Sequence, residues 1–206
     1  MAVPGLETAR LILRPMELAD APAIQRLFPR WEVVRLLANV VPWPYPEDGA
    51  LNYIGNVVLP AMERGTEWHW TIRPKTAPDE LIGAIGVMAG EGDNRGFWIA
   101  PEWQGHGYAT EAAERVTAFW FEDLGMERMR VPKAVANVGS RRVSEKQGMR
   151  LVGTMEKDYV SGRLASEIWE ITAEEWKNRQ RQGLNADQGG TKARIWSGPG
   201  WRKANG

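Results

Sequence analysis

A glycine-rich turn between a strand and a helix is the part of this sequence best suited to chemistry. The apolar run 95–100 ends at Pro101, and the turn Gln104-Gly-His-Gly107 leads directly into a helical pattern that begins near Tyr108. The first turn of a helix leaves backbone N–H groups unpaired, and the helix dipole adds positive potential there. Glycines 105 and 107 allow left-handed backbone conformations and a close approach to an anion. The spacing therefore predicts a site for a phosphate or pyrophosphate group.

Two common phosphate-binding motifs do not fit this turn. A nucleotide P-loop ends in Gly-Lys-Ser/Thr, whereas Gly107 is followed by Tyr108. The dinucleotide motif needs three glycines at set spacing, and this turn supplies two at a different spacing. The interpretation of the turn therefore depends on the residues that flank it.

The flanks resemble one family. Gln104–Ala109 matches the pyrophosphate loop of the GNAT family of N-acetyltransferases, which reads Arg or Gln, two residues, Gly, one residue, then Gly or Ala. Asn137–Gly148 resembles the Asn…Ser…Lys…Gly segment of that family. The resemblance covers roughly residues 6–175, and the segments Glu7–Arg14 and Leu81–Gly86 are typical of the RimJ/RimL branch, which acetylates protein N-termini. It implies a mixed α/β fold with a central, mostly antiparallel, splayed sheet flanked by helices, and acetyl-CoA as the cofactor.

The resemblance also implies cofactor contacts. Backbone groups at the strand end would pair with the pantetheine arm, and the loop N–H groups would hold the pyrophosphate. Asn137 would hydrogen-bond the pantetheine, and a splayed strand pair would leave N–H groups free to polarise the thioester carbonyl. Arg141 and Arg142 could contact the 3′-phosphate of coenzyme A or form a solvated helix face. The expected cofactor-binding residues are Trp98, Ile99, Ala100, Gln104, Gly105, His106, Gly107, Tyr108, Ala109, Thr110, Asn137, Ser140 and Arg142.

Acetyl transfer to an amine needs a group that removes a proton from the amine, and a second group can protonate the leaving thiolate. Some branches of the family use a tyrosine seven residues after the Asn for the second task, but that position is Ser144 here. We expect Ser140, near the thioester sulfur, to serve instead, and Glu156 to be the general base. An exposed carboxylate without a catalytic role is an equally good interpretation of Glu156. The alternatives for the base are Glu67, His69 and Asp158.

Hydrophobic periodicity predicts the elements that position these residues. Helices are expected after Asp20 and over 47–64, on either side of the segment Val41–Pro46, whose three prolines remove N–H donors and exclude regular structure. The expected strands are 8–14, 67–73, 81–88, 95–100, 128–135, 151–155 and 164–171, and the helices near the glycine turn and the Asn segment are 108–125 and 137–147.

Composition excludes several classes of protein and site. The 206 residues include no cysteine and two histidines, so we expect no disulfide, no thiol nucleophile and no metal site. Lys+Arg and Asp+Glu both number 26, and this balance does not favour nucleic-acid binding. The sequence shows no membrane-length apolar run and no secretory pattern near residue 1, so a cytoplasmic protein without membrane contact is expected.

The expected organisation is one acetyltransferase domain over residues 1–180 and a C-terminal tail over 181–206. The tail is rich in glycine and carries Trp196 and Trp201. It could pack on the domain or on a neighbouring chain, which makes a homodimer one option.

The acceptor amine is predicted in outline only. The first hypothesis is the N-terminal α-amino group of a protein, and the second is a small amine such as an amino acid, a polyamine or an antibiotic. The segment around Trp43 and Tyr45 precedes the sheet, where this family builds its acceptor wall. A non-catalytic module that binds acyl-CoA is the third hypothesis, because one fold can carry different functions.

Overall fold

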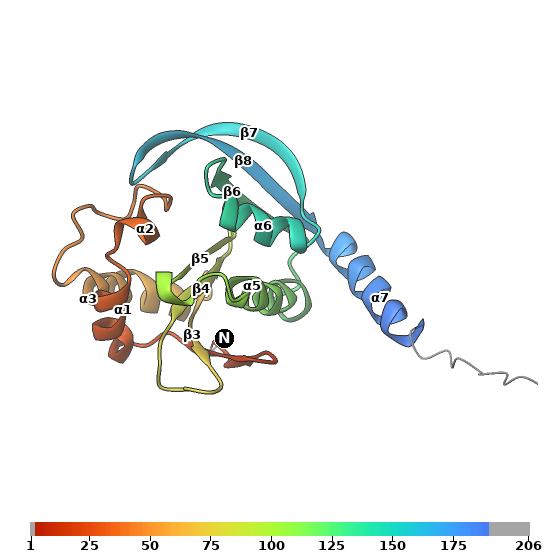
Figure 1. The fold of residues 1–206 in the computed structure, drawn as a ribbon, viewed down its shortest axis with the longest axis horizontal. Helices are drawn as coiled ribbons and strands as arrows, with labels where there is room; N and C mark the ends of the chain where they lie inside the picture. Colours follow the sequence, from red (N-terminus) through yellow and green to blue (C-terminus); the bar gives the residue numbers. More distant parts are fainter. Residues whose placement is uncertain (1–2, 190–206) are drawn as a thin grey trace, which may run out of the picture.

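The computed structural model describes residues 3–189, and its strands form two antiparallel sheets (Figure 1). In the larger sheet the strands follow one another in chain order: β1 (Leu6–Glu7), β2 (Leu11–Pro15), β3 (Glu67–Pro74), β4 (Gly83–Met88) and β5 (Arg95–Ile99). The smaller sheet has the order β6-β8-β7, with β6 (Arg128–Ala134), β7 (Arg150–Tyr159) and β8 (Gly162–Thr172).

The two sheets are joined at one point and then diverge. Asn94, just before β5, donates its N–H to the carbonyl oxygen of Arg130 over 2.7 Å, and its Oδ1 accepts the N–H of Arg130 over 2.8 Å. Beyond this point, no backbone hydrogen bond joins β5 to β6 in the described chain. We call this divergence of the two strand edges the split. It confirms the mixed α/β fold with a splayed, antiparallel arrangement of strands.

Helices cover both faces of the larger sheet. Side chains alternate along β3, so Trp68 and Trp70 point to one face, where the Trp70 ring lies 5.3 Å from that of Phe119. His69 and Thr71 point to the other face and are also buried. We call these the α5 face and the α1 face. The helical segments before β3 are η1 (Leu18–Asp20), α1 (Ala21–Leu27), α2 (Trp31–Val34), α3 (Gly49–Tyr53), η2 (Ile54–Val58) and α4 (Leu59–Arg64). The later ones are η3 (Pro101–Trp103), α5 (Tyr108–Ala118), η4 (Phe119–Asp123), α6 (Val138–Lys146) and α7 (Ala173–Gly189).

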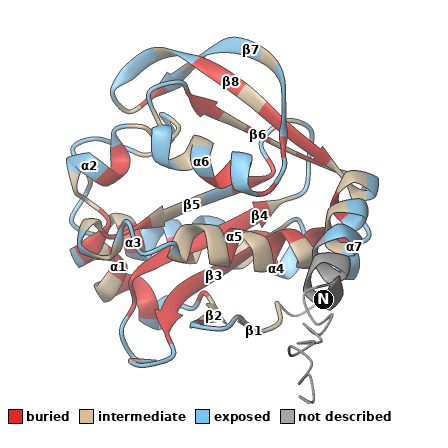
Figure 2. Cartoon of the chain, turned by 45° about the vertical axis from the view of Figure 1, so that its right-hand side comes forward, coloured by how far each residue is buried: buried red, intermediate tan, exposed pale blue. Residues whose placement is uncertain are grey.

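The early helices form one hydrophobic cluster with the α1 face, and α5 forms a second cluster with the α5 face. Figure 2 shows α5 in front of β3 and β4, with α6 beside it, and strands of the larger sheet that are buried along most of their length. By contrast, β7 is mostly exposed. The larger sheet, which carries the glycine turn, therefore forms most of the buried core.

The hairpin of β7 and β8 arches over to the segment that follows α2 (Figure 1). Val160 donates its N–H to the carbonyl oxygen of Leu37 over 3.1 Å, and Ser161 donates to that of Arg35 over 3.1 Å. Asn39 donates in the opposite direction, to the carbonyl oxygen of Asp158, over 3.3 Å. These bonds join the smaller sheet to the helical layer on the α1 face of the larger sheet, at a second point besides Asn94.

Most of the expected elements are present, with two corrections. The predicted strand 8–14 is interrupted, because Thr8 Oγ1 accepts the N–H of Leu11 over 2.9 Å and forms a turn between β1 and β2. The segment 47–64 is helical, but Leu51 and Val57 are exposed although their spacing predicted a buried face. The π-helical turn η2 changes the angular spacing of side chains and moves these two out of the core. Val41–Pro46 forms no helix or strand, as expected.

The predicted domain boundary after residue 180 falls inside α7, which continues to Gly189. This helix packs on the domain, where Trp176 Nε1 donates to Glu122 Oε1 over 3.1 Å and Arg179 pairs with Glu114. The expectations for Trp196 and Trp201 concern positions outside the described residues.

Candidate active site

The edge of β5 that faces the split has no partner strand after Asn94. Ala100 donates its N–H to Ile82 in the direction of β4 over 2.9 Å, and the carbonyl oxygen of Asn94 accepts from Met88 over 3.1 Å. Because backbone groups alternate in direction along an antiparallel strand, those of Ile99 and of Phe97 turn toward the split. The expected backbone pairing of Ala100 with a pantetheine arm stays a prediction, but both of its backbone groups already have partners in the chain. Its N–H is used by β4, and its carbonyl oxygen accepts from Trp103 over 2.9 Å.

The glycine turn presents a run of unpaired donors. Within the described residues, no hydrogen bond is donated by the backbone N–H groups of residues 105–110, and the first paired one is Glu111, which donates to Gly107 over 3.1 Å. Gly105 and Gly107 have φ values of +80° and +82°, in the left-handed region that favours glycine. Free N–H groups at the N-terminus of α5 fit the oxygens of a pyrophosphate. The donor set therefore suits the ligand that the sequence predicted.

The turn is held in place from both sides. Gln104 Nε2 donates to the carbonyl oxygen of Ile99 over 2.8 Å, so its side chain braces the turn against β5. On the other side of the turn, Arg10, the residue before β2, donates to the carbonyl oxygen of His106 over 3.1 Å. Its guanidinium lies 4.7 Å from the centre of the Tyr108 ring. Sequence reasoning missed Arg10, although it lies in a segment that supported the family resemblance.

Glu111 connects the turn to the N-terminal strands. It accepts from Arg10 Nε over 2.7 Å and from Thr8 Oγ1 over 2.6 Å. Partial burial opposes ionisation of Glu111, but the bonds from Thr8 and Arg10 outweigh it and lower the pKa of this carboxyl. Arg10 is therefore fixed by a carboxylate beside the free N–H groups.

The Asn segment forms the start of α6. Asn137 caps this helix, because its Oδ1 accepts the N–H of Ser140 over 3.1 Å, and the NH₂ group of the same side chain remains as a donor. Arg141 pairs with Glu167 over 2.7 Å, whereas Arg142 is exposed and forms no ion pair within the described chain. Of the two arginines, Arg142 is thus the one that stays available for a phosphate.

Two buried cations lie under α6, and sequence reasoning missed both. Lys133 of β6 donates to Ser144 Oγ and, over 3.3 Å, to the carbonyl oxygen of Ser140. Arg95 of β5 donates to Gln147 Oε1 over 2.5 Å and to Thr117 Oγ1 over 2.9 Å. In the part of the chain that the structure describes, neither cation has a carboxylate within salt-bridge distance.

Burial lowers the pKa of both groups. It lowers the pKa of Arg95 to about 10. Burial, together with the charge of Arg95, lowers the pKa of Lys133 to about 7. Ser144 stands where some branches of the family carry a tyrosine, and here it contacts Lys133. A lysine that titrates near neutral pH thus lies against the first turn of α6.

Glu156 and Ser140 share no hydrogen bond. Glu156 is exposed and forms no hydrogen bond or ion pair with another described residue. It is paired with Ala165 in β8, two residues from Glu167, and Glu167 contacts α6. Glu156 therefore lies on the same side of the smaller sheet as α6, and its catalytic role stays a prediction.

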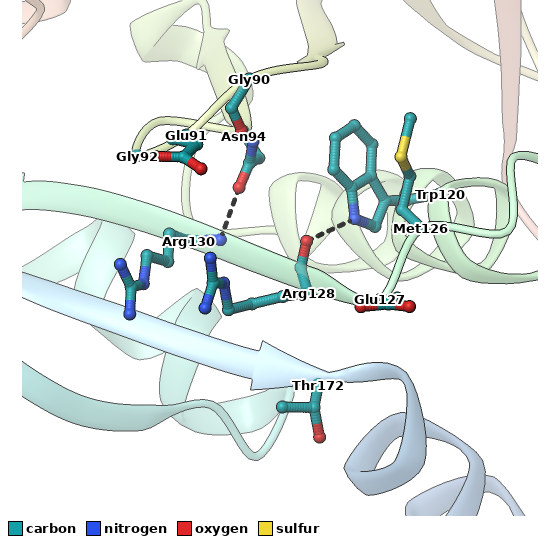
Figure 3. A pocket seen from close by; sticks show the side chains of 10 residues that line it. All are labelled: Gly90, Glu91, Gly92, Asn94, Trp120, Met126, Glu127, Arg128, Arg130 and Thr172. Carbon is teal, nitrogen blue, oxygen red and sulfur yellow. Dashed lines mark hydrogen bonds between the residues drawn. The ribbon is translucent and has the colours of Figure 1, made fainter.

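Two pockets among the described residues lie away from the expected site residues. One, of about 440 Å³, lies where the β4–β5 loop meets the start of β6 (Figure 3). It is lined by Gly90, Glu91, Gly92, Asn94, Trp120, Met126, Glu127, Arg128, Arg130 and Thr172. The other, of about 530 Å³, lies beside α1 and α3. In the described residues there is no group of three potential metal ligands, and no helix is long and apolar enough to cross a membrane.

Known proteins support the same interpretation. Residues 10–150 match the model of the acetyltransferase (GNAT) domain family. The uncharacterized N-acetyltransferase YoaA of Bacillus subtilis is 32% identical over 161 residues, which cover 75% of this chain and 87% of the relative. The FsC-acetyl coenzyme A-N(2)-transacetylase of Aspergillus fumigatus is 26% identical over 200 residues, which cover 89% of this chain and 82% of the relative.

Among solved structures, the ribosomal L7/L12 alpha-N-protein acetyltransferase RimL in complex with coenzyme A has a TM-score of 0.71. The match covers 84% of this chain and 99% of that one at 16% identity, so it shows the fold. The family match, the relatives and the donor-rich glycine turn agree. The chain belongs to the GNAT family and is an acetyl-CoA-dependent N-acetyltransferase.

Proposed function

We propose that this enzyme acetylates the N-terminal α-amino group of a protein. The observation that carries the proposal is the split itself, where the unpaired edge of β5 lies next to the donor-rich turn at residues 105–110. An acetyl-bearing arm can pair with this edge from the α5 face, and the α1 face is left for the amine. RimL, whose structure has the same fold, is by name an alpha-N-protein acetyltransferase.

The residues have distinct tasks in this proposal. The N–H groups of the turn hold the pyrophosphate, and Asn137 donates its NH₂ group to the pantetheine. Backbone N–H groups along the free edge of β5 polarise the thioester carbonyl. Ser140 assists protonation of the departing sulfur, and Glu156 is the predicted base.

An aromatic wall on the α1 face supports a peptide acceptor. The ring of Phe28 lies 5.2 Å from that of Tyr45 and 5.4 Å from that of Trp98, so the proline-rich segment packs against β5 through α1. Next to it, the rings of Trp31 and Trp43 are 5.4 Å apart, and both residues are exposed. Exposed, paired aromatic rings are typical of surfaces that bind peptides.

A small amine is the second candidate. The fungal relative aligns with most of this chain and is by name an FsC-acetyl coenzyme A-N(2)-transacetylase. Both candidates use the same cofactor site and differ only on the α1 face.

The experiment that separates the candidates is an acceptor panel. We would measure thiol release from acetyl-CoA with short peptides that begin with Ala, Ser or Met, with the same peptides blocked at the N-terminus, and with free amino acids and polyamines. Turnover of free peptides and none of blocked peptides supports the proposal. Turnover of small amines alone favours the second candidate, and acetyl-CoA binding without turnover of any amine overturns both.

A further inference from the structure

A carboxylate–imidazole pair lies on the α1 face of the larger sheet, and no task in the proposed function uses it. Glu67 and His69 are two residues apart on β3, so both side chains point to the same face. His69 Nε2 lies 2.6 Å from Glu67 Oε2. The side chain of His69 is 9% exposed and that of Glu67 is 29% exposed, so the pair is buried at the imidazole and open at the carboxylate.

The imidazole leans toward the split across a row of glycines. His69 is paired with Gly86 of β4, which is paired in turn with Gly96 of β5. A Cβ atom at Gly86 would lie 2.5 Å from His69 Nδ1 and 2.8 Å from its Cε1, so the ring covers this glycine. A Cβ atom at Gly96 would meet nothing within 4 Å. The row therefore leaves room between the ring and the edge of β5 that borders the split.

The hydrogen bond to Glu67 determines which nitrogen can accept a proton. A carboxylate accepts hydrogen bonds, so a neutral His69 carries its hydrogen on Nε2 and a lone pair on Nδ1. Nδ1 forms no hydrogen bond with a described residue, and it is not among the fully buried polar atoms that lack a partner. Nδ1 is thus a solvent-reached acceptor above Gly86.

We propose that His69 is the general base that takes a proton from the acceptor amine, directly or through one water, and that Glu67 holds the imidazole in the required tautomer. This proposal rests on the proposed acetyl transfer and replaces Glu156 as the base. It follows the order of groups in other activated sites, where a carboxylate orients a histidine and the histidine moves the proton.

In the proposed step, the acetyl group moves from sulfur to nitrogen. The neutral amine nitrogen forms a bond to the thioester carbonyl carbon, the carbon–sulfur bond breaks with its electron pair on sulfur, and the proton lost by nitrogen moves to Nδ1. The thiolate takes a proton from water beside Ser140. His69 then returns its proton to solvent before the next turnover.

The charged and titratable groups around the pair come from several elements. The hydrogen bond from His69 lowers the pKa of Glu67, although burial opposes this, and the charges of His69 and of Arg64 at the end of α4 act in the same direction as the bond. Tyr53 at the end of α3 and Tyr45 of the proline-rich segment complete the surroundings. Glu67 therefore stays ionised and keeps its bond to the imidazole across the neutral pH range.

The test compares variants that remove the base with variants that displace it. In His69→Gln we expect kcat/KM for the amine to fall about 100-fold, within the usual contribution of a general base. The acetyl-CoA affinity, measured by calorimetry, should be unchanged. Gly86→Ala should have a similar effect because the added methyl group collides with the ring, whereas Gly5→Ala, whose Cβ meets nothing within 4 Å, should not.

A second variant keeps the test decisive if His69→Gln fails to fold. Glu67→Gln preserves shape but removes the charge that stabilises the imidazolium. The kcat for amine acetylation should then fall about tenfold, while the KM for acetyl-CoA stays unchanged. A loss of acetyl-CoA affinity together with kcat would indicate a merely structural role of Glu67.

Each outcome separates this proposal from the proposed function. If kcat/KM stays within twofold in His69→Gln and collapses in Glu156→Gln, Glu156 is the base and the inference is wrong. If the wild-type enzyme acetylates only small amines, the N-terminal proposal fails and the same comparison is made with that amine. If no amine is turned over, both proposals fall.

Discussion

The two faces of the larger sheet present different kinds of chemical groups beside the split. On the α5 face, the groups that suit the cofactor are mostly backbone N–H groups, at residues 105–110 and along the edge of β5. On the α1 face, the candidate groups are side chains from separate segments, among them His69 of β3, Trp98 of β5 and Trp43 of the proline-rich segment. The groups on the α5 face come mostly from one stretch of chain, whereas those on the α1 face come from segments that are distant in the sequence.

This difference explains what each face can specify. A backbone site recognises a feature shared by a whole family, because its geometry depends on a few glycines and a helix start. A side-chain site can change its ligand by substitution without changing the fold. The printed names agree with this division: RimL, which shares the fold, is named for ribosomal L7/L12 and is in complex with coenzyme A, and the fungal relative is named for FsC and acetyl coenzyme A.

The largest expected effect comes from breaking the backbone site. Gly107→Glu places a side chain at φ +82° and a negative charge among the free N–H groups. We expect acetyl-CoA affinity to fall by about 100-fold or more, which corresponds to about 2.7 kcal/mol, as measured by calorimetry. Gly5→Glu is the control. An unchanged dissociation constant in Gly107→Glu would show that the turn does not bind the cofactor.

A smaller effect is expected at Asn137, where two roles can be separated. Asn137→Asp keeps an N-cap acceptor for Ser140 but loses the NH₂ donor. We expect its unfolding free energy to stay within about 0.5 kcal/mol of the wild type, while the KM for acetyl-CoA rises about tenfold through loss of a hydrogen bond and the added charge. Asn137→Ala should in addition lose about 1 kcal/mol of stability.

Equal activity of Asn137→Asp and the wild type would restrict Asn137 to capping. Chemical denaturation and initial rates over a range of acetyl-CoA concentrations measure the two quantities separately.

Loss of Arg10, which supports the glycine turn, should weaken acetyl-CoA binding less than a change in the turn itself. Arg10→Ala removes the bond to His106 and the ion pair with Glu111. Because such partly exposed contacts contribute about 1 kcal/mol or less, we expect the KM for acetyl-CoA to rise about fivefold with kcat nearly unchanged. Lys75→Ala, which removes an exposed pair with Glu7, is the matched control and should change neither constant. A fall in kcat alone would contradict a supporting role.

The smallest effect on acetyl transfer is expected at the buried lysine, where the main change is in stability. Burial lowers the pKa of Lys133 to about 7 in the folded state from 10.5 in the unfolded chain. Between these values the unfolded chain binds the extra proton, so the stability of the wild type rises with pH. Lys133→Met removes this dependence.

The stability of Lys133→Met relative to the wild type should therefore decrease by roughly 2 kcal/mol from pH 6 to pH 9. Denaturant unfolding at each pH measures this difference. A constant difference would mean that Lys133 stays charged when folded, with its ordinary pKa.

Local patterns predicted much of the fold. The helix that starts at Tyr108 and the helix expected over 137–147 appear where the sequence placed them, because the turn and end signals of helices act within a few positions. The failures lie where distant contacts decide. The turn at Thr8 depends on a bond to Leu11 and to Glu111 of α5, and the exposure of Leu51 depends on the π-helical turn that follows α3.

The candidate site shows the same limit. Nothing in the sequence separates Arg95 and Lys133 from other charged residues in strands, and they become unusual only when α6 covers them. Similarly, Ala100 was expected to pair with a cofactor because it ends the strand, but its backbone groups are used by Ile82 and Trp103.

By itself, the sequence predicted a phosphate site, since two glycines, a strand end and a helix start lie within one short stretch of chain, and the family resemblance added the cofactor. Only the tertiary structure decided what lies opposite. The sequence offered Glu67 and His69 as separate alternatives for the base, and the fold pairs them beside Gly86, whereas Arg10 is an ordinary arginine until Glu111 fixes it at the turn. The physical reason is that backbone donors are set by local conformation, whereas a side chain acquires its function from neighbours that are distant in the sequence.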